Sequence, residues 1–145
     1  MDLTIQAALI NVSDLKQSVD FYRDVFDLDV VSQADRVTAL MVSEKDRRQV
    51  VLLRELGRNP YHGGRGNIGL RMLSFEVGSI EELETIEQRF VQRQALVWHG
   101  TTGNFRAIMG LDPDRIEVSV SSSVAGTPIT RDDWRNLDDT IYAID

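Results

Sequence analysis

The chain has 145 residues, of which 42% are hydrophobic and 27% charged, a composition that predicts one globular domain with a substantial core. The net charge is −7 and no run of Lys and Arg stands out, so we expect no nucleic-acid partner. No stretch reaches the roughly 18 apolar residues of a membrane span, no secretion signal opens the chain, and the absence of cysteine excludes disulfides and thiolate ligands, so we expect a cytoplasmic protein without a membrane partner.

The first predicted elements are a strand and a helix. Residues 7–12 fit the period of a strand, with Ala8, Ile10 and Val12 on one face and Ala7, Leu9 and Asn11 on the other. Ser13 and Asp14 follow and are good helix caps. From Leu15 to Phe26 apolar residues recur at spacings of four, three and four, which predicts an amphipathic helix. Three further short strands are predicted near 29–32, 37–42 and 49–54.

The same order of elements returns 65 residues later. Residues 72–77 alternate as a strand, Ser79 with Glu82 forms a capping box, and helical spacing follows as far as Phe90. Between the two copies lies GRNPYHGGRGNIG, residues 57–69, whose five glycines and one proline predict a linker. Three more short strands are predicted near 95–98, 104–109 and 115–120.

Each half is therefore predicted to be β-α-β-β-β, and the fold class to be α+β. We expect two βαβββ modules that form a half-open, curled mixed sheet around a cleft, plus a C-terminal helix. An apolar stripe from Trp134 to Ile144 predicts that helix, which docks on its own domain, closes the cleft as a lid, or crosses to a second subunit. The predicted single domain 1–145 comprises module 1 at about 3–56, the linker 57–69, module 2 at about 70–121 and the tail 122–145.

Strand alternation assigns one face of each strand to the helices and the other face to the cleft. Leu9, Leu52 and Met72 would make the cleft floor apolar, which suits an aromatic or hydrophobic small molecule. We expect the ligand to contact the cleft-side residues Ala7, Leu9, Asn11, Leu52, Met72, Ser74, Arg115 and Glu117, and we place Glu76 and Ser119 on the same side.

Three segments carry a family resemblance. NVSDLKQSVDFYRDVFDLDV resembles the opening helix of the vicinal oxygen chelate superfamily, which includes glyoxalase I, extradiol dioxygenases, fosfomycin-resistance enzymes and bleomycin-resistance proteins. GLRMLSFEV at 69–77 is similar to the second opening strand of the family. DPDRIEV at 112–118 is similar to its closing DPDGNRIEL-type signature, shortened by two residues. The resemblance covers roughly residues 5–121 and implies a cleft, frequent dimers and, in metal-using members, a divalent ion.

The resemblance also locates the metal ligands, which come from the first and last strands of each half. The closing glutamate of the family falls on Glu117, whereas the other positions fall on Ala7, Met72 and near Leu52. Three apolar residues and one carboxylate cannot hold a transition metal tightly, and a thioether is too soft for the ions of this chemistry. We therefore expect no metal cofactor.

The chain has only two histidines. His99, in VWHGTTGNF, is a candidate acid or base near the cleft, and its alternative role is that of an ordinary loop histidine. His62 lies in the linker. If the linker folds over the cleft, then Glu117, His99 and His62 form the alternative site for a divalent metal.

Three functional hypotheses follow. The first is a metal-independent protein that binds a small, partly apolar organic molecule, with Glu117 as polar anchor. The alternative is a dioxygenase-, glyoxalase- or isomerase-like enzyme with an altered metal site or with Glu117 as general base, and His99 as the second catalytic candidate. The third is a regulatory or structural dimer with a vestigial cleft. In each case the resemblance implies a homodimer.

Overall fold

The structure is a computed structural model. The chain divides into two compact units, Met1–His62 and Gly63–Asp145, and this division falls within the expected linker, 57–69. The linker, the predicted C-terminal helix, Ala7 and His62 lie outside the described residues. The structure describes residues 8–32, 37–43, 47–56, 72–102 and 105–123.

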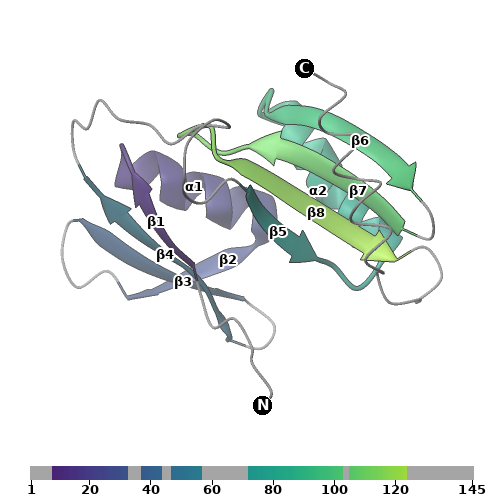
Figure 1. Ribbon diagram of the computed structural model, residues 1–145. Helices are drawn as coiled ribbons and strands as arrows, with labels where there is room; N and C mark the ends of the chain where they lie inside the picture. Colours follow the sequence, from purple (N-terminus) through teal and green to yellow (C-terminus); the bar gives the residue numbers. More distant parts are fainter. Residues whose placement is uncertain (1–7, 33–36, 44–46, 57–71, 103–104, 124–145) are drawn as a thin grey trace, which may run out of the picture. The chain divides into compact units, whose positions relative to one another are not determined.

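The first unit is a four-stranded mixed sheet with one helix (Figure 1). Its strand order is β1-β4-β3-β2, in which β1 and β4 are parallel and the other pairs antiparallel. The helix begins as predicted, because the Asp14 side chain accepts a hydrogen bond of 2.9 Å from the Gln17 N–H. It ends at Asp27, which adopts the left-handed conformation. The elements are β1 Ala8–Val12, α1 Leu15–Phe26, β2 Leu28–Ser32, β3 Thr38–Ser43 and β4 Gln49–Glu55.

The second unit repeats this architecture with the order β5-β8-β7-β6, which confirms the predicted pair of βαβββ modules. The predicted capping box also forms. Ser79 Oγ accepts from the Glu82 N–H at 3.2 Å, and Glu82 Oε2 accepts from the Gly78 N–H, one residue before the cap, at 2.9 Å. The elements are β5 Met72–Glu76, α2 Ile80–Gln92, β6 Leu96–Thr102, β7 Phe105–Leu111 and β8 Glu117–Ser123.

The two units are not offset by one constant number of residues. Asn11 pairs with Arg54 in the first unit, and Glu76 pairs with Ser121 in the second. The opening strands are therefore 65 residues apart, whereas the closing strands are 67 apart. It follows that the counterpart of Glu117 is Val50, and not Leu52 as the constant shift suggests.

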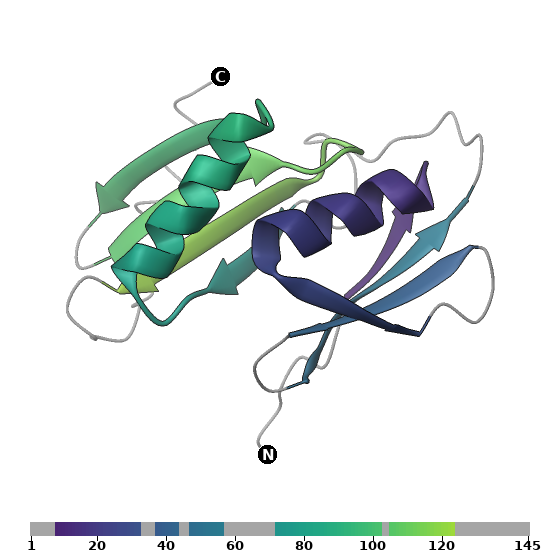
Figure 2. The same ribbon diagram turned by 180° about the vertical axis from the view of Figure 1, so that it is seen from behind.

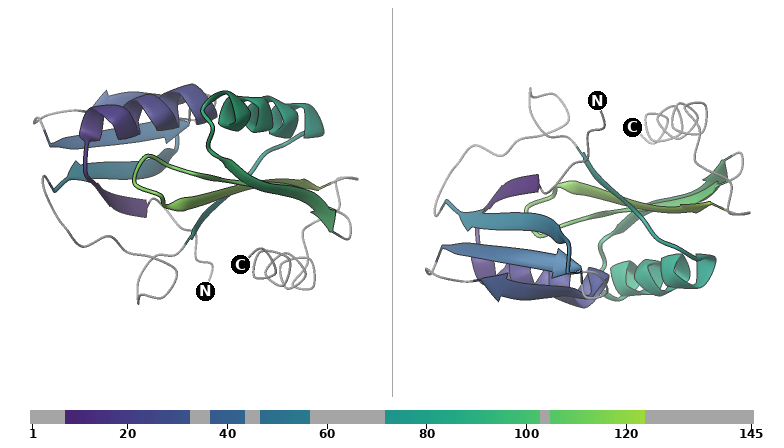
Figure 3. Two further views of the ribbon diagram at one scale, coloured as in Figure 1. Left: turned by 90° about the horizontal axis from the view of Figure 1, so that it is seen from above. Right: turned by 90° about the horizontal axis from the view of Figure 1, so that it is seen from below.

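Each helix covers one face of its own sheet (Figures 2 and 3). In the first unit the strand residues that face α1, such as Ile10 and Leu53, are buried, while Leu9 on the other face is 58% exposed. In the second unit the Phe90 ring packs so closely on Gly110 that a Cβ there would lie 2.3 Å from the ring. Neither helix in the described part of the chain is long and apolar enough to cross a bilayer.

Candidate functional site

The face of the second sheet opposite α2 carries the candidate site, and we call it the helix-free face because α2, the one helix described in this unit, lies on the other face. Register partners project on the same side of a sheet, so the ladder pairings identify its members. Met72 is paired with Glu117, and Ser119 is paired with both Ser74 and Met109. The described members of the helix-free face include Met72, Ser74 and Glu76 on β5, Trp98 and Gly100 on β6, Ala107, Met109 and Leu111 on β7, and Glu117, Ser119 and Ser121 on β8.

Glu117 is the buried carboxylate of this face, and only 8% of its surface is exposed. Met72 packs against the buried cluster of Ala107 and Met109, together with Trp98. Because β8 lies between β5 and β7, the Met72 side chain must reach across β8 to make this contact. The Glu117 carboxylate therefore lies on a face whose large apolar side chains are those of Met72, Met109, Leu111 and Trp98.

Three serines, Ser74, Ser119 and Ser121, lie on the same face as Glu117. The Ser119 hydroxyl donates a 2.8 Å hydrogen bond to the Ser74 hydroxyl on the neighbouring strand. Ser121 is 2% exposed, and its Oγ has no hydrogen-bond partner in the described part of the chain. A buried hydroxyl without a partner has an energetic cost, which a bound water would relieve.

The turn before β8 determines where Glu117 begins the strand. The buried carboxylate of Asp112 accepts 2.8 Å hydrogen bonds from the N–H groups of Asp114 and Ile116. The backbone closes the same turn, because the Arg115 N–H donates to the Asp112 carbonyl at 2.9 Å. Arg115 has a φ of 64° and is exposed, so it belongs to this turn and not to the strand predicted from residue 115.

His99 lies on the opposite face of the sheet from Glu117. It is paired with Ile108, which is paired with Val120 on the α2 side. Its Nδ1 contacts Glu87 of α2, and its side chain is 64% exposed. The structure therefore does not bring His99 and Glu117 together, either as a catalytic pair or as metal ligands.

Glu87 contacts Arg106 as well as His99. Its other oxygen accepts a 2.6 Å hydrogen bond from Arg106 Nη2, and Arg106 Nη1 donates to Glu84 at 3.0 Å. The His99 side chain thus belongs to a network of charges that ties α2 to β6 and β7. Within this network His99 has Glu87 as its partner.

The other predicted cleft residues lie on the first unit. Leu9 and Asn11 are exposed on the face opposite α1, and Leu52, the register partner of Leu9, is partly buried there. Val50 lies on the same strand and face as Leu52. Ala7, the remaining predicted cleft residue of this unit, lies outside the described residues.

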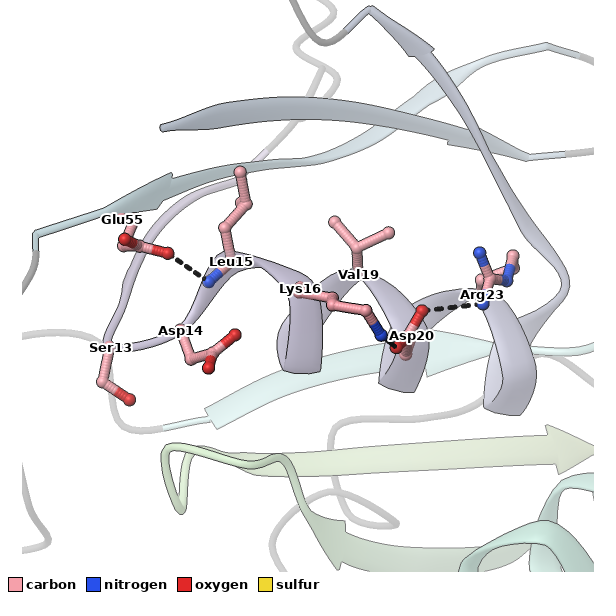
Figure 4. A pocket seen from close by; sticks show the side chains of 8 residues that line it. All are labelled: Ser13, Asp14, Leu15, Lys16, Val19, Asp20, Arg23 and Glu55. Atoms are coloured by element: carbon pink, nitrogen blue, oxygen red, sulfur yellow. Dashed lines mark hydrogen bonds and ion pairs between the residues drawn. The ribbon is translucent and has the colours of Figure 1, made fainter. Parts of the chain in front are cut away.

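A pocket in the first unit lies beside the first turns of α1 (Figure 4). Several of its charged side chains form hydrogen bonds or ion pairs within the pocket. Glu55 Oε2 accepts from the Leu15 N–H at 2.7 Å, and the Asp20 carboxylate accepts from both Lys16 and Arg23 at 2.7 Å. The hydrogen bond from Lys16 lowers the pKa of the Asp20 carboxyl. The pocket therefore offers mainly paired surface charges to a ligand.

The donor atoms of the helix-free face do not suit a divalent ion. Among the described residues, no group of three or more His, Cys, Asp and Glu side chains is positioned to hold a metal. At the family's ligand positions within the second unit the chain offers one carboxylate, Glu117, beside the soft thioether of Met72. The described residues of the second unit therefore supply one strong metal ligand, Glu117, at these positions.

Sequence reasoning missed six described members of this face, namely Trp98, Gly100, Ala107, Met109, Leu111 and Ser121. Ser121 continues the alternation of Glu117 and Ser119, so a strand predicted beyond residue 120 would have included it. No such signal exists for Trp98, because the pairing of β6 with β7 shifts between Leu96 and Trp98. One extra residue at that bulge inverts the faces of the strand that follows.

Comparisons with known proteins agree with this fold. The model of the Glyoxalase/Bleomycin resistance protein/Dioxygenase superfamily matches residues 4–120. A glyoxylase/bleomycin resistance protein/dioxygenase domain from Frankia sp. EAN1pec is similar at a TM-score of 0.74 and 22% identity, over 88% of this chain and 96% of that one. A lactoylglutathione lyase from Agrobacterium tumefaciens is similar at 0.63 and 20%, over 86% and 97%.

A fosfomycin resistance protein from Listeria monocytogenes is similar at a TM-score of 0.66 and 14% identity, over 92% of this chain and 98% of that one. At such identities the structural matches establish the fold alone. A comparison with curated proteins finds no significant match.

Proposed function

The chain belongs to the Glyoxalase/Bleomycin resistance protein/Dioxygenase superfamily, and from this premise we propose that it binds a small, partly apolar organic molecule without the usual divalent ion. The observation that carries the proposal is the pairing of Met72 with Glu117. A thioether stands where a metal site would need a second hard donor. What remains is one buried carboxylate in a largely apolar setting, which is the composition of an organic ligand site.

Glu117 is the polar anchor in this proposal. A carboxylate that accepts a hydrogen bond from a ligand amine or hydroxyl forms a charge-assisted bond, and such bonds are stronger than neutral ones. The thioether of Met72 and the side chains packed with it supply apolar contact area. Orientation would come from the carboxylate, and most of the binding free energy from the apolar contacts.

A thermal-shift screen of ring-containing amines and alcohols tests the proposal, since a ligand that binds only the folded state raises its stability. We expect Glu117→Gln to weaken binding of a hit by roughly ten- to a hundredfold, the loss of one hydrogen bond to a charged group. Glu76→Gln is the matched control, because it removes an exposed carboxylate from the same face. Equal losses in both variants would count against Glu117 as the anchor.

The metal content of untagged protein is the second test. Elemental analysis after incubation with Mn, Fe, Ni and Zn should find no stoichiometric ion. A retained ion that Glu117→Gln releases would refute the metal-free proposal and favour an enzyme.

The second candidate function is catalysis with Glu117 as general base. The burial of the Glu117 carboxylate favours this role. A panel would include fosfomycin and lactoylglutathione, which the names of two structural neighbours suggest. Turnover that Glu117→Gln abolishes and Glu76→Gln preserves would establish this candidate. If the protein neither binds nor converts any compound, the third hypothesis, a dimer with a vestigial cleft, takes its place.

We also retain the homodimer and the cytoplasmic location as part of the proposal, on the basis of the family resemblance. Light scattering coupled to size-exclusion chromatography measures the mass in solution directly. A mass near 16.4 kDa would identify a monomer and would remove the dimer from the proposal.

A further inference from the structure

The helix-free face is more deeply buried than the equivalent face of the first unit. Three of its members on β8 are at most 8% exposed, namely Glu117, Ser119 and Ser121. Their counterparts on β4 are Val50 and Leu52, which are partly buried, and Arg54, which is exposed. Because the two sheets share one architecture, this difference calls for a cover on the second sheet that the first sheet lacks.

Side chains on the edge strands account for part of the burial. Met72 on β5 and Trp98 on β6 pack against Ala107 and Met109. The Met109 side chain is longer than those of Ala107 and Ser119 beside it, yet it is 0% exposed. Its outer end therefore needs a contact from above the sheet as well as from the sides.

The first unit shows how much burial flanking side chains provide in this architecture. Leu52 on the central strand β4 has Leu9 and Leu40 as register partners, one on each side. Between these two large neighbours it remains partly exposed. A further layer over β7 and β8 would account for the deeper burial of the second sheet.

The second compact unit includes a segment suited to form this layer. The unit extends from Gly63 to Asp145, and its longer segments outside the described ranges are 63–71 and 124–145. The segment 63–71 has four glycines. The segment 124–145 carries the apolar stripe Trp134, Leu137, Ile141 and Ile144, and a helix with such a stripe packs it on an apolar surface.

The dimensions of this segment match those of the face. As a helix, residues 134–144 would be about 16 Å long and about 10 Å wide, which is enough to cover two strands about 4.8 Å apart. The part of β8 from Glu117 to Ser121 spans about 13 Å. Because β8 ends at Ser123, the ten residues 124–133 connect the strand to the stripe. Extended, they reach about 33 Å, which lets the helix fold back over β8.

We propose that the C-terminal segment 124–145 docks as an amphipathic helix on the helix-free face of its own second sheet. The stripe packs over Met109 between Met72 and Trp98, so that this sheet has a helix on each face. The inference goes beyond the proposed function and needs no ligand. It also makes the segment a neighbour of Glu117.

A nitroxide on the helix-free face tests this docking. The chain has no cysteine, so Glu76→Cys provides a single labelling site at an exposed position of the face. The readout is the indole N–H resonance of Trp134 in protein labelled with ¹⁵N-tryptophan, and Trp134→Phe assigns it. We expect the nitroxide at position 76 to broaden this resonance at least tenfold more than a nitroxide at Gln88→Cys, an exposed position on α2.

Two matched double variants in the Glu76→Cys background test the apolar stripe. Leu137→Glu with Ile141→Glu places two charges in the stripe and should abolish the broadening. Asn136→Glu with Ala143→Glu places the same charges on the side of the helix away from the stripe and should preserve it. Absence of broadening from position 76, equal broadening from the two nitroxide positions, or equal effects of the double variants would overturn the docking.

A mixed sample identifies the chain to which the docked segment belongs. Nitroxide-labelled protein without ¹⁵N is mixed with ¹⁵N-labelled protein without nitroxide, and the Trp134 resonance should stay unchanged. Broadening in the mixture would show that the segment covers the sheet of a second copy, and docking within one chain would be refuted.

The outcomes leave the proposed function to its own tests. If a ligand binds in a manner that depends on Glu117 while the nitroxide leaves Trp134 unaffected, the docking is refuted and the binding function stands. If Trp134 is broadened as expected and no compound binds, the docking stands alone.

Discussion

Met72 and Glu117 stand opposite each other as register partners on the parallel strands β5 and β8. Neighbouring strands are about 4.8 Å apart, so a thioether and a carboxylate leave the same face of the sheet side by side. In metal-using relatives the resemblance places two hard ligands at this pair of positions. A single substitution, at Met72, would therefore place two metal-binding side chains next to each other on this face.

Replacing Met72 with histidine should restore affinity for a metal. In Met72→His an imidazole nitrogen would lie beside the Glu117 carboxylate, and such a pair of donors suits Zn²⁺ or Ni²⁺. We expect calorimetry on chelator-treated protein to show binding at least tenfold tighter than that of the wild type.

Ser74→His is the control for this experiment, because its register partner is Ser119 and not a carboxylate. The double variant Met72→His with Glu117→Gln should lose the gain. If Ser74→His binds the ion equally well, the two ligand positions are assigned wrongly.

Gly110→Ala should destabilise the second unit. The new Cβ would lie 2.3 Å from the buried Phe90 ring, and overpacking of this kind costs about 1–3 kcal/mol or more. Urea denaturation measures the free energy of unfolding. Gly78→Ala is the matched control, since its Cβ would meet only Glu82 Oε2 at 3.4 Å, and we expect a change within about 0.5 kcal/mol.

Asp112→Ala should weaken the turn that begins β8. The substitution leaves the N–H groups of Asp114 and Ile116 without their acceptor, at about 1–3 kcal/mol for a buried donor. Asp112→Asn keeps an oxygen acceptor in place and should cost about 1 kcal/mol less. Equal losses in the two variants, measured by urea denaturation, would show that the charge of Asp112 matters more than its hydrogen bonds.

His99→Ala should leave ligand binding unchanged. The side chain lies on the α2 side of the sheet, where it contacts Glu87, so its removal should lower stability slightly and affect no group on the helix-free face. The affinity of a hit from the thermal-shift screen is the measurement, and Glu117→Gln is the comparison. A loss of affinity in His99→Ala as large as that in Glu117→Gln would contradict the assignment of faces.

The elements of the fold could be predicted from local sequence. Capping by Asp14 and Ser79 and the helical spacing that follows each are local signals, and both helices begin where those signals place them. The alternation around Ile10 likewise identified the side of β1 that faces the core. Such signals suffice because each depends on interactions within a few residues.

The candidate site could be predicted only in part, because it depends on pairing between distant strands. The closing strands of the two units are 67 residues apart and the opening strands 65, which makes Val50 the counterpart of Glu117. This two-residue difference arises between elements and produces no periodic pattern in the sequence. The bulge between Leu96 and Trp98 likewise decides which of Trp98 and His99 joins the helix-free face. A one-residue shift of this kind exchanges the two faces of a strand, and the sequence alone does not show it.

The parallel pairing of β5 with β8 also has a consequence for biosynthesis. It joins the first and last strands of the second unit, and its hydroxyl contact links residues 45 positions apart in the chain. Contacts of such long range form late, since the intervening chain must first be ordered. On the ribosome, β5 and α2 must therefore wait for β8 to emerge before this sheet can close. A nascent chain that ends before Glu117 should expose an unpaired edge of β5 to chaperones and proteases.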